Sequence, residues 1–598
     1  MKMRISEILE SLRISMGVNG AQWYLADTAD PHASEYVSPH YAEREFLSGF
    51  TGSAGTLLVG IETALLWTDG RYYVQAEKEL KDSGITLMRS GDAGVLSLEQ
   101  YIEKYFASGD TLFLDGKLIS AEKGLRLKKA LSSAGCKIKI GRNLTHVIWK
   151  DRPADSAEEI RVLPPELCGC DYKQKLKDLK DALAEAGAEA CVLCALDEQM
   201  WLFNLRGRDI PCNPVAYAYT VVTKQKVSLY AKERAVNDEL CAFARDEDIT
   251  LRPYEDFYKD LTDLHFEGAV LLDPKSCNFL ILRILQRNGN RTVCADSPVK
   301  AAKAVKNEKE QEWIRKVYLE DSAVLTRFLR YVKEQGAGQD ELSLARRLDE
   351  MRLSLADCSD LSFSTISAFG PNAAMMHYEA TEEHSDVLKE GGFYLVDSGG
   401  QYDGGTTDVT RTLAIGEVPA ELKKQFTRVC AGMLALQNAV FLSGAAGRNL
   451  DILARQPVWE MAMDYKCGTG HGVGYMLNVH EGPQNIRTKL QPGQTDAELL
   501  PGMLVSDEPG VYVAGSHGVR IENILLVQHK TENSDGEFLC FEPLTWVPVD
   551  LDAIDAEALK PHEREWLNAY HAKVREKLMP LLRDPEDAAF LHRATREI

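Results

Sequence analysis

The stretch GGFYLVDSGGQYDGGTTDVTRT, residues 391–412, places two carboxylates in strand-like surroundings. Asp397 follows the apolar residues FYLV, and Asp408 comes eleven residues later, after a glycine-rich turn. Short apolar stretches bounded by glycine are typical of strands joined by turns. We therefore expect two strands that are joined by a turn, each with one acidic side chain.

Three similar stretches lie further along the chain: GTGHGVG around His471, LVSDEPGVYV around Glu508 and GVRIENILLV around Glu522. A carboxylate that is buried in such a strand must be paired or must bind a metal. Four carboxylates cannot pair with one another as anions, whereas two divalent cations would neutralise them. Carboxylate oxygens with one imidazole suit manganese, cobalt or zinc. Two such ions can activate water and polarise a carbonyl, so the pattern predicts a dimetal hydrolase.

Other enzyme signatures do not fit the sequence. It contains no phosphate-binding G-x-x-x-x-G-K-[ST] and no G-x-S-x-G nucleophile elbow. His480-Glu481 lacks the second histidine of H-E-x-x-H, and CGTGHGVG lacks the glycine spacing of a dinucleotide site. Any one of the five acids and histidines alone would be an ordinary strand-end residue, so the prediction depends on all five together.

The five contexts, in this order, resemble the pita-bread metallopeptidases, which include methionine aminopeptidase, prolidase and aminopeptidase P. The N-terminal half resembles the long, three-domain aminopeptidase P group in DPHASEYVSPHYAEREFLSGFTGSAG, LLWTDGRYYVQAE and MWLFNLRGRDIPCNPVAYAY. The resemblance implies an α/β chain with two related, creatinase-like N-terminal α/β domains. A pita-bread catalytic domain, pseudo-symmetric around a curved antiparallel sheet, follows them.

Local patterns suggest where these domains meet. The polar stretch WKDRPADSAEE marks a first boundary, and a long helical pattern starts near Lys306. We expect domains at residues 1–155, 156–305 and 306–598, with a helical extension at the C-terminal end. The order of predicted elements is similar in the first two segments, which suggests copies of one α/β unit.

The resemblance also implies roles for individual residues. Asp397 would chelate one metal, Asp408 and Glu522 would bridge the two ions, and His471 and Glu508 would bind the other. Glu508 would also serve as general base toward the attacking water. His377 in FGPNAAMMHYEAT would stabilise the oxyanion or shuttle protons, and His480 in LNVHEGP would contact the substrate near the scissile bond. Arg520 would lie near the site and bind substrate, and Tyr512 is a weaker candidate for a supporting role.

The implied activity is removal of the N-terminal residue from peptides with proline in the second position. The implied cofactors are two divalent ions, with manganese as the first choice and cobalt or zinc as alternatives. Prolidase, which cleaves only the Xaa-Pro dipeptide, is the nearest rival, and a non-catalytic pita-bread module that binds peptides is a more distant one. Members of the family often carry a histidine four residues before the metal-binding histidine, where it lines the pocket for proline. This chain has Cys467 at that position.

Composition sets further expectations. The net charge of −21 disfavours nucleic acid and anionic membranes as partners. No apolar stretch reaches the roughly 18 residues of a membrane span. The N-terminal MKMRISEILESLRISMGV resembles an amphipathic helix more than a secretory signal, which favours the cytoplasm. The thirteen cysteines are scattered, as is typical of reduced thiols, although Cys168, Cys170, Cys191 and Cys194 leave a structural zinc site open. The C-terminal helical stretch and the resemblance suggest a homodimer.

Overall fold

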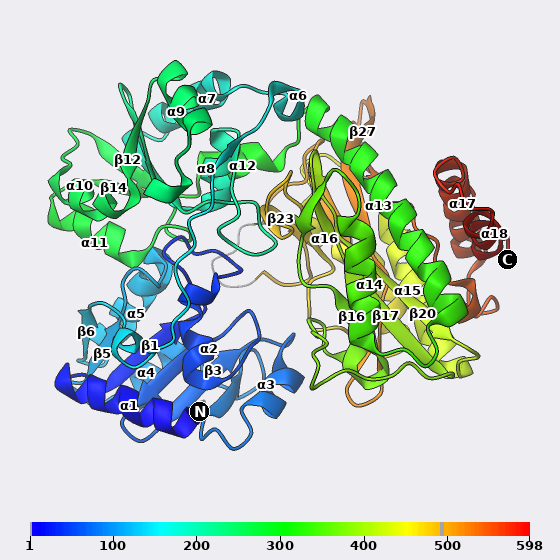
Figure 1. Ribbon diagram of the computed structural model, residues 1–598, viewed down its shortest axis with the longest axis horizontal. Coiled ribbons are helices and arrows are strands. Elements are labelled where there is room, and N and C mark those ends of the chain that lie inside the picture. Colours follow the sequence, from blue (N-terminus) through cyan, green and yellow to red (C-terminus); the bar gives the residue numbers. More distant parts are fainter. Residues whose placement is uncertain (1–2, 491–495) are drawn as a thin grey trace. The chain divides into compact units, whose positions relative to one another are not determined.

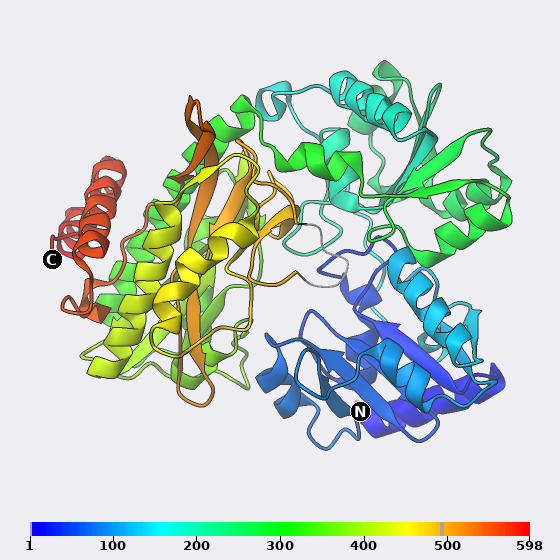
Figure 2. The same ribbon diagram turned by 180° about the vertical axis from the view of Figure 1, so that it is seen from behind.

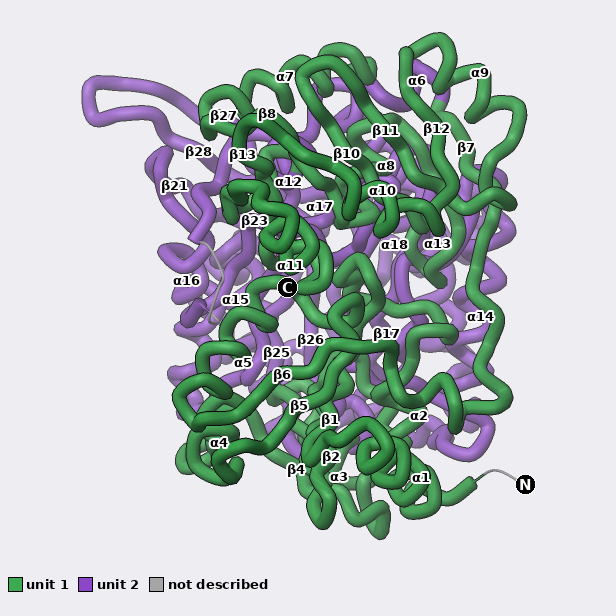
Figure 3. Tube along the Cα trace, turned by 90° about the vertical axis from the view of Figure 1, so that its left-hand side faces the viewer, with its two compact units in different colours: residues 1–163, 170–299 green, residues 164–169, 300–598 purple. Residues whose placement is uncertain are grey.

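The computed structural model describes residues 3–490 and 496–598, which divide into two compact units (Figure 3). Unit 1 comprises Met1–Leu163 and Cys170–Val299, and unit 2 comprises Pro164–Gly169 and Lys300–Ile598. The finer division into three domains, with boundaries at 155 and 305, stays a prediction.

Unit 1 contains two six-stranded sheets of the same topology. In strand order, the first is β4 (Thr86–Arg89), β3 (Ala64–Thr68), β2 (Thr56–Gly60), β1 (Trp23–Asp27), β5 (Thr111–Leu114) and β6 (Lys137–Ile140). The second is β12 (Ile249–Pro253), β11 (Val227–Ala231), β10 (Ala218–Thr223), β8 (Ala188–Leu193), β13 (Ala269–Leu272) and β14 (Thr292–Cys294). In the strand orders given, the pairings are parallel, antiparallel, antiparallel, parallel and parallel in both sheets. This shared topology confirms that the chain starts with two related α/β domains.

The longer helices of unit 1 are α1 (Ile5–Val18), α4 (Leu98–Tyr105), α5 (Ala121–Ser133), α7 (Tyr172–Glu185), α9 (Asp238–Asp246) and α11 (Phe279–Arg287). The N-terminal α1 is amphipathic, as predicted, because it buries Ile8, Leu12 and Met16 at helical spacing. Cys191 and Cys194 are buried on and directly after β8, where thiols act as small apolar groups. Among the described residues, no helix is long and apolar enough to span a bilayer.

The strands of unit 2 all pair antiparallel, as expected for a pita-bread sheet. One sheet has the order β16 (Ile366–Phe369), β17 (Gly392–Ser398) and β20 (Val409–Ile415). Another has the order β21 (Val440–Leu442), β28 (Gly536–Pro543), β27 (Asn523–Asn533) and β24 (Leu504–Asp507). Two hairpins complete the region: β22 (Gly470–Gly472) with β23 (Glu481–Ile486), and β25 (Gly510–Val513) with β26 (His517–Arg520).

Two helix pairs support these strands, α13 (Glu308–Gln335) with α14 (Glu341–Leu353), and α15 (Ala420–Gln437) with α16 (Gly447–Trp459). Helix α14 packs on β16, and α15 packs on β24. Figures 1 and 2 show helices of unit 2 beside its strands from two opposite sides. The Asn307 side chain caps α13, which buries Val317, Val324 and Phe328 at the predicted helical spacing. The remaining helices discussed below are α12 (Pro298–Ala304), α17 (Pro561–Leu578) and α18 (Pro585–Ala594).

Candidate dimetal active site

The five predicted ligands lie on or beside strands of unit 2. Asp397 belongs to β17, and Asp408 directly precedes β20. His471 is the central residue of β22, and Glu508 directly follows β24. Glu522 was expected inside a strand but lies in the short connection between β26 and β27.

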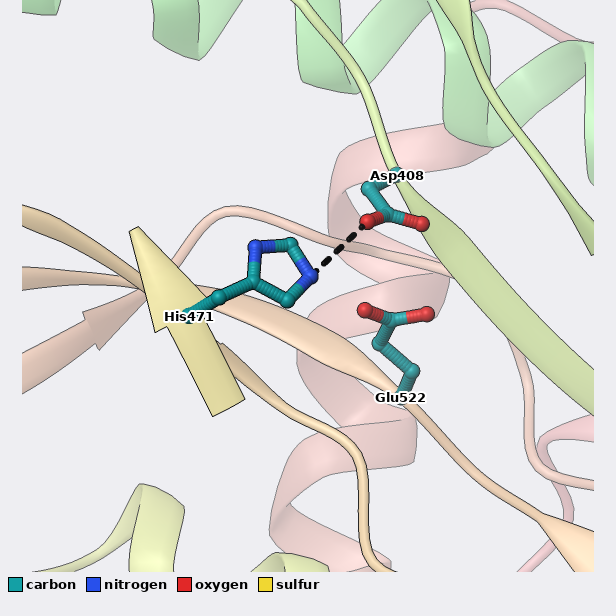
Figure 4. Close-up of side chains that lie close together, drawn as sticks. All are labelled: Asp408, His471 and Glu522. Atoms are coloured by element: carbon teal, nitrogen blue, oxygen red, sulfur yellow. Dashed lines mark ion pairs between the residues drawn. The ribbon is translucent and has the colours of Figure 1, made fainter. Parts of the chain in front are cut away.

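Three of the five side chains form a compact cluster, which Figure 4 shows. Ligand atoms of Asp408, His471 and Glu522 all lie within 4.8 Å of one another, and within residues 3–490 and 496–598 no other histidine, cysteine or acid group does so. The Nε2 atom of His471 lies 3.4 Å from Oδ2 of Asp408 and 3.3 Å from Oε1 of Glu508. The structure therefore brings four of the predicted ligands together.

Asp397, the fifth, is tied to the same cluster through Arg520. The Nη2 atom of Arg520 donates to Oδ2 of Asp397 at 2.6 Å, and its Nε donates to Oγ1 of Thr410 at 3.0 Å. Thr410 in turn donates to Oε2 of Glu522 at 2.8 Å and faces Asp397 across the strand pair. Arg520 also donates to the hydroxyl of Tyr512 at 2.8 Å, so both residues lie beside the acids as expected.

Two carboxylate oxygens in this cluster provide a test of metal binding. Within the part of the chain that the structure describes, Oδ1 of Asp397 and Oε1 of Glu522 are buried and accept no hydrogen bond. A buried carboxylate oxygen without a donor is costly, and metal coordination removes that cost. With one imidazole and four carboxylates, the residues fit a pair of divalent ions with nitrogen and oxygen ligands.

The electrostatics of the site lead to the same conclusion. Burial raises the pKa of Glu522 well above its usual range, and the charge of Asp408 raises it further. Burial likewise raises the pKa values of Asp397 and Glu508, although Arg520 opposes the increase at Asp397 and His471 opposes it at Glu508. Crowded, buried acids of this kind ionise together only when cations are near. Divalent ions supply that charge and reverse the direction of these shifts.

His471 is oriented so that one ring nitrogen faces the acids. Its Nδ1 lies 2.9 Å from the backbone oxygen of Gly472, which fixes Nδ1 as the donor and leaves Nε2 available to bind a metal ion. Burial lowers the pKa of His471, but the hydrogen bond to Asp408 and the charge of Glu508 outweigh burial and raise the pKa to about 9. A metal ion would take the place of that proton.

The glycines beside His471 have a steric role. A Cβ atom on Gly470 would collide with the backbone oxygen of Ser506, and one on Gly472 would collide with that of Glu481. Only glycine permits the strand to approach its neighbours this closely. The glycine-rich motif GTGHGVG thus positions His471 and is not a phosphate-binding loop.

The two further predicted histidines lie near the cluster in different ways. The rings of His480 and His471 meet edge to face, with centroids 4.3 Å apart. His377 follows Met376, whose backbone oxygen lies 3.4 Å from Nη2 of Arg520. The structure thus places His480 against His471, a predicted metal ligand, and His377 on a loop that Arg520 contacts.

Three supporting residues were not found from the sequence. Thr410 holds Glu522, and Oγ of Ser506 donates to Oε1 of Glu508 at 3.1 Å. Asp507 is fully buried with neither carboxylate oxygen hydrogen-bonded in the described chain, and burial raises its pKa well above the usual range, with a further increase from Glu508. Spacing two from Asp408 was a usable signal for Thr410, because alternate residues of a strand share a face.

Comparison with known proteins identifies the family. Residues 312–529 match metallopeptidase family M24, and residues 537–598 match the C-terminal region of that family. Residues 19–152 and 151–310 each match the creatinase/prolidase N-terminal domain. The chain therefore belongs to metallopeptidase family M24. This assignment confirms the predicted resemblance and the fold class.

Relatives that match the chain over almost its whole length are named Xaa-Pro aminopeptidase P or aminopeptidase P. A probable Xaa-Pro aminopeptidase P of Talaromyces marneffei is 39% identical over 96% of this chain and 89% of its own length. Aminopeptidase P2 of Arabidopsis thaliana is 37% identical over 100% of this chain and 89% of its own length.

Solved structures give the same result. The X-prolyl aminopeptidase of Caenorhabditis elegans, described as a cytosolic enzyme with a di-nuclear active site, is 32% identical and superposes with a TM-score of 0.95 over 100% of both chains. An Xaa-Pro dipeptidase of Bacillus anthracis shares the fold over 64% of this chain and 99% of its own, with 24% identity and a TM-score of 0.52. The aminopeptidase of Caenorhabditis elegans thus covers the complete chain, whereas the dipeptidase of Bacillus anthracis covers 64% of it.

Proposed function

We infer that the chain is a dimetal hydrolase that removes the N-terminal residue from peptides with proline in the second position. The cluster of Asp408, His471 and Glu522, with ligand atoms within 4.8 Å of one another, carries this proposal. The full-length similarity to Xaa-Pro aminopeptidases favours it over a dipeptide-only prolidase. Cleavage of an Xaa-Pro-Yaa peptide by the metal-loaded chain tests it directly.

The proposed ligand roles are those that the family resemblance implies. Asp397 would hold one ion, His471 with Glu508 would hold the second, and Asp408 and Glu522 would contribute to both. When bound, the ions lower the pKa of water and polarise the carbonyl that is attacked. Buried oxygens on Asp397 and Glu522 that lack hydrogen-bond donors in the described chain support these assignments.

Protein groups supply the remaining chemistry. Glu508, held by Ser506, takes the proton from the attacking water as general base. His480 contacts the substrate near the scissile bond, and His377 stabilises the negative charge that develops on the carbonyl oxygen or shuttles protons. Arg520 keeps Asp397 in place through the 2.6 Å contact and favours its ionised form.

Several finer properties belong to the same proposal. We expect manganese in the site, with cobalt and zinc as alternatives, because the ligands are mainly carboxylate oxygens. We expect a cytoplasmic homodimer. The cytosolic X-prolyl aminopeptidase of Caenorhabditis elegans supports the compartment by similarity, and the helical C-terminal region, α17 and α18, is the basis for the dimer.

Cys467 distinguishes this chain from family members with a histidine at that position. Its backbone oxygen accepts a hydrogen bond from Nη2 of Arg455 at 2.8 Å, which anchors the loop before His471. Burial raises the pKa of the Cys467 thiol to about 12, and the charge of Glu508 contributes. A neutral thiol is a poor metal ligand, so we assign Cys467 to the wall of the proline pocket.

Replacing Cys467 with histidine should leave metal content unchanged and change mainly KM, because uniform binding of the substrate is what the pocket wall provides. Steady-state kinetics on an Xaa-Pro-Yaa peptide, together with metal analysis, measures both effects. Cys467→Ala is the companion variant. If Cys467→Ala no longer retained metal, the thiol would be a ligand and the five-residue set would be incomplete.

A further inference from the structure

Glu481 adjoins the two site histidines, His471 and His480. It follows His480 in the chain, and its backbone pairs with Gly472, the neighbour of His471, across the β22–β23 hairpin. A displacement of this one residue would therefore move the backbone of His480, its neighbour in the chain. Its side chain is 1% exposed, so something in the interior must hold its charge.

Two buried lysines hold that carboxylate from opposite oxygens. Nζ of Lys303 lies 2.6 Å from Oε2 of Glu481, and Nζ of Lys306 lies 2.6 Å from Oε1. Both lysines are at most 3% exposed. Nζ of Lys306 also donates to the backbone oxygen of Ala304 at 3.2 Å. Charge-assisted contacts at this distance are short and directional, so they fix the carboxylate in one orientation.

The loop between the two histidines closes around the same carboxylate. The backbone N–H of Gly474 donates to the oxygen of Asn478 at 2.9 Å. A Cβ atom on Gly474 would stand 3.0 Å from Oε2 of Glu481, so the loop backbone lies directly against the charge. Glu310, 2% exposed, adds a second negative charge near Lys306, which balances the two lysines. Burying charged groups of this kind costs free energy, because they lose their hydration. Their best-documented role is to specify a single conformation.

We propose that Lys303 and Lys306 are positioning residues of the active site: they clamp Glu481 and thereby hold His480 against His471 in the place where it meets the substrate. The proposal rests on the function proposed above. The lysines do not touch substrate or metal, and they act only through the backbone of Glu481. Because Lys303 and Lys306 precede α13, the first helix of the catalytic region, this segment contributes to the site although it is distant in sequence.

A double-mutant cycle on the metal-loaded full chain tests the proposal, with kcat/KM for an Xaa-Pro-Yaa peptide as the measured quantity. Lys306→Met should lower kcat/KM by about 10–100-fold, the usual effect when a group that orients an active-site ligand is lost. Its metal content should equal that of the wild type, because His480 is not a metal ligand. Combined with His480→Ala, Lys306→Met should cause no further loss, because the clamp acts through His480.

Arg428→Met is the matched control. Arg428 forms a similarly buried ion pair with Glu563, 2.8 Å apart, between α15 and α17. Arg428→Met should lower Tm without changing kcat/KM. If the role of Lys306 were purely structural, Lys306→Met would likewise lower Tm and leave kcat/KM unchanged. If Lys306→Met is insoluble, Glu481→Gln takes its place in the cycle, because the amide keeps the shape but loses the charge.

The outcomes separate this proposal from the one on which it rests. A wild-type chain that does not cleave Xaa-Pro-Yaa peptides contradicts the proposed function. If the wild type cleaves them and Lys306→Met retains full kcat/KM, loses metal, or loses activity additively with His480→Ala, the clamp is refuted while the function stands. Non-additive loss with two ions retained supports the clamp.

Discussion

Asp408→Ala should abolish turnover and prevent the chain from holding two metal ions. Asp408 is the proposed bridge, and its Oδ2 lies 3.4 Å from Nε2 of His471, so its loss affects both ions at once. Removing several kcal/mol of transition-state stabilisation corresponds to at least about 1,000-fold in kcat/KM. Metal analysis of the purified variant, together with its kinetics, provides the measurement.

Asp535→Ala is the control for this variant. Asp535 is an exposed acid in the turn between β27 and β28, so its removal changes the net charge equally without touching the cluster. It should retain both ions and full turnover. If Asp408→Ala retained two tightly bound ions and normal kcat/KM, the assignment of the metal site would be wrong.

The substrate preference should be the second large effect. An Xaa-Pro-Yaa peptide should have a higher kcat/KM than the Xaa-Pro dipeptide, because contacts with the third residue help to orient the scissile bond. Xaa-Ala-Yaa should be about 10–200-fold poorer, the range expected when a pocket loses one or two carbons of contact, and its backbone is also less fixed. Acetylation of the N-terminus should block cleavage, since it removes the positive charge that complements the acidic site.

Liquid chromatography of a peptide panel in the presence of manganese separates the rival activities. Preference for the bare dipeptide would reassign the chain to prolidase-type activity. Equal cleavage of the alanine and proline peptides would leave only a dimetal aminopeptidase. Binding of every peptide without cleavage of any would favour the non-catalytic module.

The sequence was sufficient for the fold, and it singled out residues that the structure brings together, because these residues carry strong local signals; their roles stay predictions. Asp397, Asp408 and Glu522 stand out as acids in apolar, strand-forming stretches, where an ionised group needs a cation. Glycines around His471 mark a close backbone approach, although only the structure shows which atoms they avoid. The two N-terminal copies were visible as a repeated order of elements, and their common strand order became clear only in three dimensions.

The residues that the sequence missed depend on long-range pairing. Thr410 contacts Glu522 across 112 positions, and Lys303 contacts Glu481 across 178. No local pattern encodes such partners, because each lysine or threonine alone resembles an ordinary surface or strand residue. Asp507 is similar: beside Glu508 it looks like a second exposed acid, and only its burial distinguishes it.

A metal titration of the apo chain tests the central claim most directly. Chelator-treated protein is supplied with increasing manganese, while bound ions per chain and cleavage of an Xaa-Pro-Yaa peptide are measured in the same samples. The five proposed ligands include four buried carboxylates that repel one another. We therefore predict that turnover reaches its maximum only as the second ion binds. Full turnover of the metal-free chain, or with a single ion bound, would contradict the dimetal account.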